Sequence, residues 1–220
     1  IIGATGSGKT TLASLIPRFY DATAGTVLVD GLDVREYTFD ALYNKLGYVT
    51  QKAVLFSGTV EDNVFFGQSA AEKTDASLQA ALSLSQAAEF VDKYPEKAAH
   101  PIAQLGRNVS GGQKQRLSIA RALARTPEIL IFDDSFSALD YKTDAVLREG
   151  LAKQLPGTTK IIVAQRISTI RNADQILVLD RGEIAGLGTH DELMVSCPVY
   201  REIAMSQLSE EELKKGGVSK

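Results

Sequence analysis

This 220-residue sequence has little of several features that would define other classes of protein. Its only cysteine is Cys197, which excludes an internal disulfide framework and suits a reducing compartment. Its apolar runs all fall well short of the roughly 18 residues that a membrane-spanning helix needs. The formal net charge of −3 provides no general electrostatic attraction to nucleic acid. The hydrophobic content of 44% instead predicts an ordinary globular domain.

The first residues form a phosphate-binding loop. Gly3 to Thr10 matches the pattern G-x-x-x-x-G-K-[ST], between the apolar pair Ile1-Ile2 and a predicted helix. Glycines let successive backbone N–H groups point inward at phosphate oxygens, Lys9 is placed to reach the β- and γ-phosphates, and the Thr10 hydroxyl is suited to Mg²⁺. The predicted nucleotide-binding residues of this loop are Gly3, Thr5, Gly6, Ser7, Gly8, Lys9, Thr10 and Thr11.

A pair of acidic residues follows a continuous apolar run. Ile129 to Phe132 has the pattern of a parallel strand buried on both faces, and Asp133 and Asp134 follow at its carboxyl end. Ligands bind at this end of the strands in open α/β sheets. Asp133 is therefore predicted to hold Mg²⁺, and the alternative of a helix-capping aspartate is less favoured beside a P-loop.

Three further motifs resemble those of the ATP-binding-cassette (ABC) ATPases. Asn108 to Gln113 resembles their LSGGQ signature, with Val109 in place of leucine; Gln51 resembles the Q-loop glutamine, and Ser137 to Asp140 resembles the D-loop. The resemblance covers essentially the whole chain, and exporter-like runs lie at 55–64 and 186–193. From the family we expect Ser110, Gly111, Gly112, Gln113 and Asp140 to bind nucleotide and Gln51 to contact Mg²⁺ or the attacking water.

The resemblance implies an α/β fold: a P-loop NTPase (RecA-like) core with a parallel sheet, a β subdomain and an inserted α-helical lobe. We expect one ABC ATPase domain over 1–220, with the core at 1–52 and 127–195 and the helical lobe at 53–126. A C-terminal helix and tail are expected at 196–220, and native sequence is expected upstream because the chain opens at a strand end. β segments are predicted at 25–31 and 176–184, and a helix-prone segment at 72–94.

Two positions depart from the family pattern. Asp134 stands where a catalytic glutamate is expected, and Gln165, after a buried strand at 159–164, stands where a switch histidine is expected. Aspartate is one methylene shorter than glutamate, and a displacement of about 1 Å at a catalytic group can cost on the order of 10²-fold in rate. Glutamine donates hydrogen bonds but carries no charge and relays no proton. The two histidines, His100 and His190, lie elsewhere in the sequence.

The family resemblance therefore implies the ATP-binding domain of a membrane ABC exporter, similar to the degenerate-site half of a bacterial heterodimeric multidrug transporter. It implies ATP and Mg²⁺ as cofactors, with Thr10, Gln51 and Asp133 around the metal. It also implies reduced ATPase activity, with Asp134, Gln165 and Gln51 as the catalytic residues. A second nucleotide-binding domain, most simply a different chain, would receive the signature. A transmembrane domain is expected upstream in the same polypeptide. The ATP-binding domain itself is expected at the cytoplasmic face of the cell membrane, with no nucleic-acid partner.

Other interpretations remain at this point. A self-sufficient homodimeric exporter would use Asp134 as its base. A non-transport ABC ATPase acting on ribosomes or DNA is disfavoured because only a short helical segment separates Gln51 from Ser110, without a coiled-coil insertion or basic stretch. A GTPase is set aside because 44–47 lacks the final aspartate of N-K-x-D. The adenine-stacking aromatic residue of the family falls upstream of this sequence.

Overall fold

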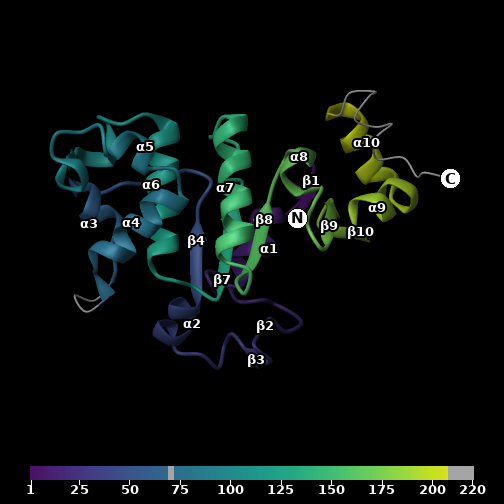
Figure 1. Ribbon diagram of the computed structural model, residues 1–220. Helices are drawn as coiled ribbons and strands as arrows, with labels where there is room; N and C mark the ends of the chain where they lie inside the picture. The colour runs from purple at the N-terminus through teal and green to yellow at the C-terminus, as the bar shows by residue number, and fades with distance from the viewer. Residues whose placement is uncertain (69–71, 208–220) are drawn as a thin grey trace.

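The structure is a computed structural model that describes residues 1–68 and 72–207. The predicted tail beyond 207 lies outside the described residues. Figure 1 shows three neighbouring regions: helices on the left, parallel strands in the middle and the C-terminal helices on the right. Within the described part of the chain, no helix combines the length and apolar character needed to cross a bilayer.

The strands of the central region form two three-stranded sheets. In one, β4, β7 and β8 run parallel in that order; in the other, β9 pairs parallel with β1 and antiparallel with β10. Their bounds are β1 Ile2–Gly3, β4 Leu46–Val49, β7 Ile129–Asp133, β8 Thr159–Val163, β9 Ile176–Asp180 and β10 Glu183–Gly188.

Backbone bonds at Ile1 connect the two sheets. The Ile1 nitrogen donates to the Ile162 carbonyl at 2.7 Å, and the Ala164 N–H donates to the Ile1 carbonyl at 3.0 Å. Residue 1 therefore lies against the end of β8 while β1 pairs with β9. This arrangement places the loop after β1 beside the loops after β7 and β8, all at the carboxyl ends of parallel strands.

Strand β7 is central because its sequence is apolar on both faces. Leu130, Ile131 and Phe132 are fully buried, and β7 pairs with β4 on one side and β8 on the other. The register sets Phe132 opposite Val49 and Asp133 opposite Val163. The predicted central strand, and the position of both aspartates at its carboxyl end, agree with this arrangement.

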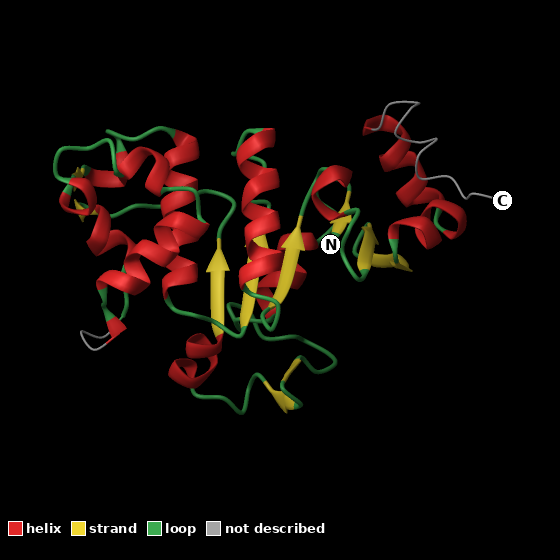
Figure 2. Cartoon of the chain, viewed as in Figure 1, coloured by secondary structure: helices red, strands yellow, loops and turns green. Residues whose placement is uncertain are grey.

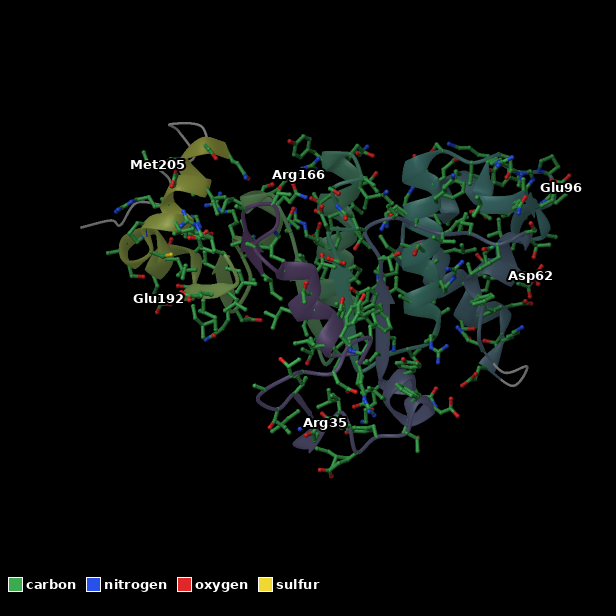
Figure 3. The ribbon with its side chains drawn as sticks, turned by 180° about the vertical axis from the view of Figure 1, so that it is seen from behind. Arg35, Asp62, Glu96, Arg166, Glu192 and Met205 are labelled. Carbon is green, nitrogen blue, oxygen red and sulfur yellow. The ribbon has the colours of Figure 1, made fainter. Side chains whose placement is uncertain are left out.

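Helices cover both faces of this sheet. Figures 1 and 3, which view the molecule from opposite sides, show α7 on one face and α1 on the other. The helix bounds are α1 Lys9–Leu15, α2 Phe39–Lys45, α3 Val60–Val64, α4 Asp75–Leu84, α5 Ala88–Val91, α6 Gly111–Ala124, α7 Tyr141–Gln154, α8 Ile167–Ile170, α9 His190–Ser196 and α10 Pro198–Gln207, with 3₁₀ turns η2 Lys97–Ala99 and η3 Gln104–Gly106.

Helices α3 to α6 gather on one side of the sheet (Figure 2). Their apolar residues join one core that includes Leu82 of α4, Leu117 of α6 and Leu147 of α7. The short pair β5 Gly58–Thr59 and β6 Pro101–Ile102 adds a two-stranded ribbon there. Because this core continues under α7 and β7, the proposed division at 53–126 stays a prediction about domain boundaries.

The helix-prone segment at 72–94 is not one helix. Helix α4 ends at Leu84, α5 begins at Ala88, and Gln86 between them has a positive φ of 62°. The Ser85 side chain bonds the backbone here, donating to the Leu82 carbonyl and accepting from the Ala87 N–H. Serine side chains compete in this way with helical backbone bonds, which explains why a sequence of good helix formers is interrupted.

The predicted β segment at 25–31 forms only a small ribbon. Strands β2 (Leu28–Val29) and β3 (Leu32–Asp33) pair antiparallel around Asp30 and Gly31, whose φ angles are 50° and 79°. Two positive φ angles in sequence define the turn that Asp-Gly pairs favour in hairpins. The second predicted segment, 176–184, is longer than expected and becomes the β9–β10 hairpin.

The C-terminal helices form a separate apolar cluster with α8. Tyr200 and Ala204 of α10 are fully buried against a set that includes Ile167 and Ile170. The single cysteine, Cys197, is buried in the same cluster. This packing fixes the start and middle of α10 beside the loop that follows β8.

Candidate functional site

The P-loop connects β1 to α1, and its shape depends on close backbone packing. A β-carbon on Gly3 would lie 2.1 Å from the Leu179 carbonyl oxygen of β9, so only glycine allows β1 to approach β9. Gly8 caps α1 with φ at 96°, a left-handed conformation. Ser7 is buried and its carbonyl accepts from the Gly182 N–H of the β9–β10 turn at 3.2 Å. Thr5 and Thr11 are exposed on this loop and helix.

Lys9 lies within the loop that precedes it. Its Nζ donates to the carbonyls of Gly3 at 2.9 Å and Ala4 at 2.8 Å, with Ser7 Oγ at 3.4 Å. Burial lowers the pKa of Lys9, and the nearby carboxylates of Asp134 and Asp133 act in the opposite direction. The ammonium group is thus held between the loop carbonyls and two acidic side chains, where it can neutralise phosphate charge.

Thr10, Asp133 and Tyr48 form a second set of contacts. The Thr10 hydroxyl donates to Asp133 Oδ1 at 2.8 Å, and the Tyr48 hydroxyl donates to Asp133 Oδ2 at 3.2 Å. Burial raises the pKa of Tyr48 to about 12, so its hydroxyl stays protonated and remains a donor. The predicted metal residues Thr10 and Asp133 are therefore in contact and offer hydroxyl and carboxylate oxygens, the donors that Mg²⁺ prefers.

Asp134 receives two side-chain amides on one oxygen. Gln165 Nε2 lies 2.6 Å and Gln51 Nε2 3.0 Å from Asp134 Oδ2. The Asp134 N–H also donates to the Val163 carbonyl at 2.9 Å, and its φ is 47°. Positive φ is uncommon outside glycine, although aspartate is among the residues that tolerate it. The three predicted catalytic residues thus meet at one point, from three different loops.

The predicted D-loop residue Asp140 has a structural partner. Its carboxylate caps α7, accepting from the Thr143 N–H at 2.9 Å and the Thr143 hydroxyl at 2.7 Å. These hydrogen bonds lower the pKa of Asp140. Asp140 is exposed, so a nucleotide-binding role stays a prediction beside the helix-capping role that the structure shows.

The signature-like residues cap a different helix. Ser110 and Gln113 form a reciprocal capping box at the start of α6: the Gln113 N–H donates to Ser110 Oγ at 3.3 Å, and the Ser110 N–H donates to Gln113 Oε1 at 2.8 Å. Gly111 has open space around it, and a β-carbon on Gly112 would lie 3.5 Å from the Ala138 carbonyl. Figure 1 places α6 among the left-hand helices, away from α1.

The structure therefore groups the predicted residues into two separate sets. The P-loop, the two aspartates, Gln51 and Gln165 lie together, whereas Ser110 to Gln113 stand apart at α6. The Ser110 and Gln113 side chains bond each other at the start of α6, whereas the Asn108 amide bonds the backbone of Pro101 and Ala103.

Neither histidine joins the first set. His190 Nδ1 lies 2.8 Å from the Tyr200 hydroxyl in the C-terminal cluster, and the His100 ring stacks on Tyr94 with centroids 3.7 Å apart. Burial lowers the pKa of His190, with the positive charge of Arg171 adding to the effect. The expectation that both histidines lie away from Asp134 agrees with these contacts.

Comparison with known proteins identifies the family. A family model described as "ABC transporter" matches residues 1–137. The chain belongs to the ABC transporter family. The α/β domain with a parallel sheet that the sequence predicted is the fold of an ABC ATPase domain.

Curated relatives and a solved structure agree with this assignment. The chain is 50% identical over 208 residues to an uncharacterized ABC transporter ATP-binding protein of Mycobacterium tuberculosis, covering 94% of the chain and 35% of the relative. It is 41% identical over 212 residues to an ATP-dependent lipid A-core flippase of Syntrophus aciditrophicus, covering 96% of the chain and 35% of the relative. The chain therefore spans about a third of the length of these relatives.

The structural likeness is equally extensive. A solved structure of a bacterial Atm1-family ABC exporter with ATP bound superposes with a TM-score of 0.90 at 37% identity, covering 95% of this chain and 36% of that chain. This ABC domain is thus similar in sequence and in fold to the ATP-binding parts of exporters.

Two residues with contacts at the site were not among the predictions. Tyr48 was not proposed as a site residue, although its position in β4, opposite Ile131 of the central strand, places it beside Asp133. Gln207 donates to the Gln165 carbonyl from the far C-terminal helix. A strand register could have indicated Tyr48, whereas no sequence signal connects 207 with 165.

Proposed function

We propose that this chain is the ATP-binding domain of a membrane ABC exporter of the bacterial heterodimeric multidrug type. It binds Mg-ATP at a P-loop site that hydrolyses slowly, and its signature completes a competent site on a different partner chain. The transmembrane part would belong to the same polypeptide, with this domain at the cytoplasmic face of the membrane.

Residues of the first set fit Mg-ATP. Lys9 and the loop glycines are arranged for phosphate oxygens, and Thr10 and Asp133 for Mg²⁺. The bound nucleotide would supply the γ-phosphoryl group that hydrolysis transfers to water. The residues of this chain would bind and orient that group and hold the metal, in the roles that such side chains serve in P-loop NTPases.

One observation carries the proposal of slow hydrolysis: the pairing of Asp134 with Gln165. The Asp134 carboxylate is the acidic group best placed to orient a water molecule, but its Oδ2 already accepts amide hydrogens from Gln165 and Gln51. Gln165 contributes no charge, and losing one oriented donor or charge at such a site costs about 10²–10³-fold in rate. An ATP that is held but slowly hydrolysed would keep two domains together.

The separate position of the signature supports the second half of the proposal. Ser110, Gly111 and Gly112 form an intact helix start, at which Ser110 and Gly111 are exposed. Backbone N–H groups at such a helix start bind anions. A partner that brings its own P-loop site, with glutamate and histidine at the two altered positions, would use this helix start to complete a faster site.

The test uses the full-length protein, purified alone and with the second transporter half that the proposal requires. We expect little ATPase activity alone and clear activity for the pair. Within the pair, replacing the partner's P-loop lysine should abolish turnover, whereas Lys9→Ala should leave a measurable part of it. Equal activity alone and in the pair, with equal effects of the two lysine changes, would refute the asymmetric model and favour the homodimeric exporter.

A further inference from the structure

The end of helix α10 is hydrogen-bonded to the loop that carries Gln165. Gln207 Nε2 donates to the Gln165 carbonyl at 2.8 Å, and Gln207 Oε1 accepts from the Ile167 N–H at 2.9 Å. The Gln207 side-chain amide therefore binds the backbone of both Gln165 and Ile167. These residues precede it by 42 and 40 positions in the sequence. Such a bidentate contact fixes the direction of the backbone between them.

The loop has a specific need for this contact. Helix α8 begins at Ile167, and its N-cap residue Arg166 provides no side-chain cap. The first N–H groups of a helix have no partner within the helix. Gln207 Oε1, from a different helix, supplies the acceptor for the Ile167 N–H. The Nε2 group of the same side chain donates to the Gln165 carbonyl.

Packing holds helix α10, which carries the exposed Gln207, in place. Tyr200 and Ala204 of α10 are fully buried in the cluster that also contains Ile167 and Ile170 of α8. Positions 200, 204 and 207 follow the i, i+4, i+7 spacing of one helix face. The face that anchors α10 therefore also directs Gln207 at the loop, and Figure 1 shows α10 next to α8.

Arg166 restrains the same loop from the opposite direction. Its Nη2 lies 3.4 Å from the Ser137 carbonyl, and its guanidinium lies over the Tyr141 ring at 4.9 Å. Figure 3 labels Arg166 between the C-terminal helices, where Met205 is marked, and α7. Arg166 thus contacts the D-loop, whereas Gln207 donates directly to the backbone carbonyl of Gln165.

We infer that Gln207 is a positioning residue for Gln165, so that helix α10 sets the direction in which the Gln165 side chain faces the nucleotide. This inference rests on the proposed function, in which Gln165 pairs with Asp134 in the Mg-ATP site. Gln165 Nε2 lies 2.6 Å from Asp134 Oδ2, and a hydrogen bond this short requires that the Gln165 backbone be held in place. Loss of Gln207 would free the Gln165 backbone to move.

The test measures how long this chain retains nucleotide in the full-length protein with its partner. The protein is loaded with 8-azido-[α-³²P]ATP and Mg²⁺, chased with unlabelled ATP, and photolysed at intervals; label on this polypeptide is then read after electrophoresis. The readout belongs to this chain's own site and does not require turnover. For Gln207→Ala we expect label to be lost about fivefold faster, the size of one hydrogen bond's net contribution.

Matched variants separate positioning from helix capping. Gln207→Glu keeps an acceptor for the Ile167 N–H but has no donor for the Gln165 carbonyl, so it should lose label as fast as Gln207→Ala. Met205→Ala, an exposed position on the same helix, should retain label like the wild type. Wild-type retention in Gln207→Glu would overturn the inference, because capping of α8 alone would then explain the contact.

A double-mutant cycle shows whether Gln207 acts through the Gln165 side chain. Gln207→Ala should have no further effect in a Gln165→Ala background, because residues that act through one another are not additive. An undiminished effect in that background would overturn the inference. If Gln165→Ala itself leaves retention unchanged, the proposed role of Gln165 fails; if Gln165→Ala shortens retention and Gln207→Ala does not, only the positioning role fails.

Discussion

Gln165 Nε2 and Asp134 Oδ2 lie 2.6 Å apart, although 31 residues separate them in the sequence. Strands β7 and β8 bring them together, because their parallel register places Asp133 opposite Val163 and sends both following loops to the same edge of the sheet. The two positions at which a catalytic glutamate and a switch histidine were expected are therefore in direct contact. A change at one of them alters the hydrogen bonding of the other.

Gln51 completes this arrangement from a third loop. Its Nε2 shares Asp134 Oδ2 with Gln165, at 3.0 Å. Two neutral donors on one carboxylate oxygen stabilise its orientation but leave that oxygen less available to a water molecule. This geometry supports the proposal that the site binds nucleotide but hydrolyses it slowly.

The first prediction concerns Lys9 and nucleotide binding. Lys9→Ala removes three hydrogen-bond donations and the positive charge inside the loop, so Mg-ATP affinity at this site should fall by about 10²-fold or more. Photolabelling of this chain by azido-ATP over a concentration series measures the change. Lys153→Ala, which affects only an exposed pair with Glu149, is the control. Unchanged labelling of Lys9→Ala would exclude a phosphate-binding role.

The second prediction concerns Tyr48 and the metal. Tyr48→Phe removes the donor to Asp133 Oδ2 without changing the ring. Residues that orient a metal ligand typically contribute 10–100-fold in metal affinity, and this single 3.2 Å contact should fall at the lower end, about tenfold. The Mg²⁺ dependence of ATP retention is the measurement, and Tyr37→Phe, whose hydroxyl bonds only the Val29 carbonyl, is the control. Coincident Mg²⁺ curves would show that Tyr48 does not support the metal site.

The third prediction concerns His190 and acid stability. Burial and Arg171 lower the pKa of His190 in the folded protein below its ordinary value near 6.5. The unfolded state then binds more protons in the range between the two values, so stability contributed by His190 is complete above about pH 6.5 and is lost as the pH falls below it.

Thermal unfolding between pH 7.5 and 5 measures this effect. Replacement by His190→Gln should make the decline in melting temperature shallower over that window, whatever its effect at neutral pH. Equal slopes for the wild type and the variant would show that His190 does not govern this part of the acid response. Tyr200→Phe removes the hydrogen-bond partner but keeps the histidine buried, so its slope should stay similar to that of the wild type.

Much of the site could be predicted because it depends on local patterns. The P-loop spacing before a helix and the apolar run before Asp133 each fix a backbone position at a strand end, and parallel strands bring such ends together. The family resemblance then placed Gln51 and Gln165 near Asp134, and the structure gives the contact itself.

The remaining features depend on contacts that sequence spacing does not encode. Tyr48 reaches Asp133 only through the register of β4 with β7, and Gln207 reaches Gln165 only through the packing of α10 on α8. The break at Gln86 was missed because the Ser85 side chain overrides good helix propensity on both sides. Asp140 was predicted to bind nucleotide from a family motif, and the structure shows that its carboxylate caps helix α7.

Steady-state ATP hydrolysis tests the central claim most directly. Full-length wild type, without its partner, is compared with the double variant Asp134→Glu, Gln165→His at saturating Mg-ATP, with ATP binding checked in both. We predict that the wild type binds ATP but turns it over slowly and that the double variant is faster by about 10²-fold, the scale of one restored catalytic group. Similar rates for the two proteins would contradict the slow-site model and make a self-sufficient homodimer the better account.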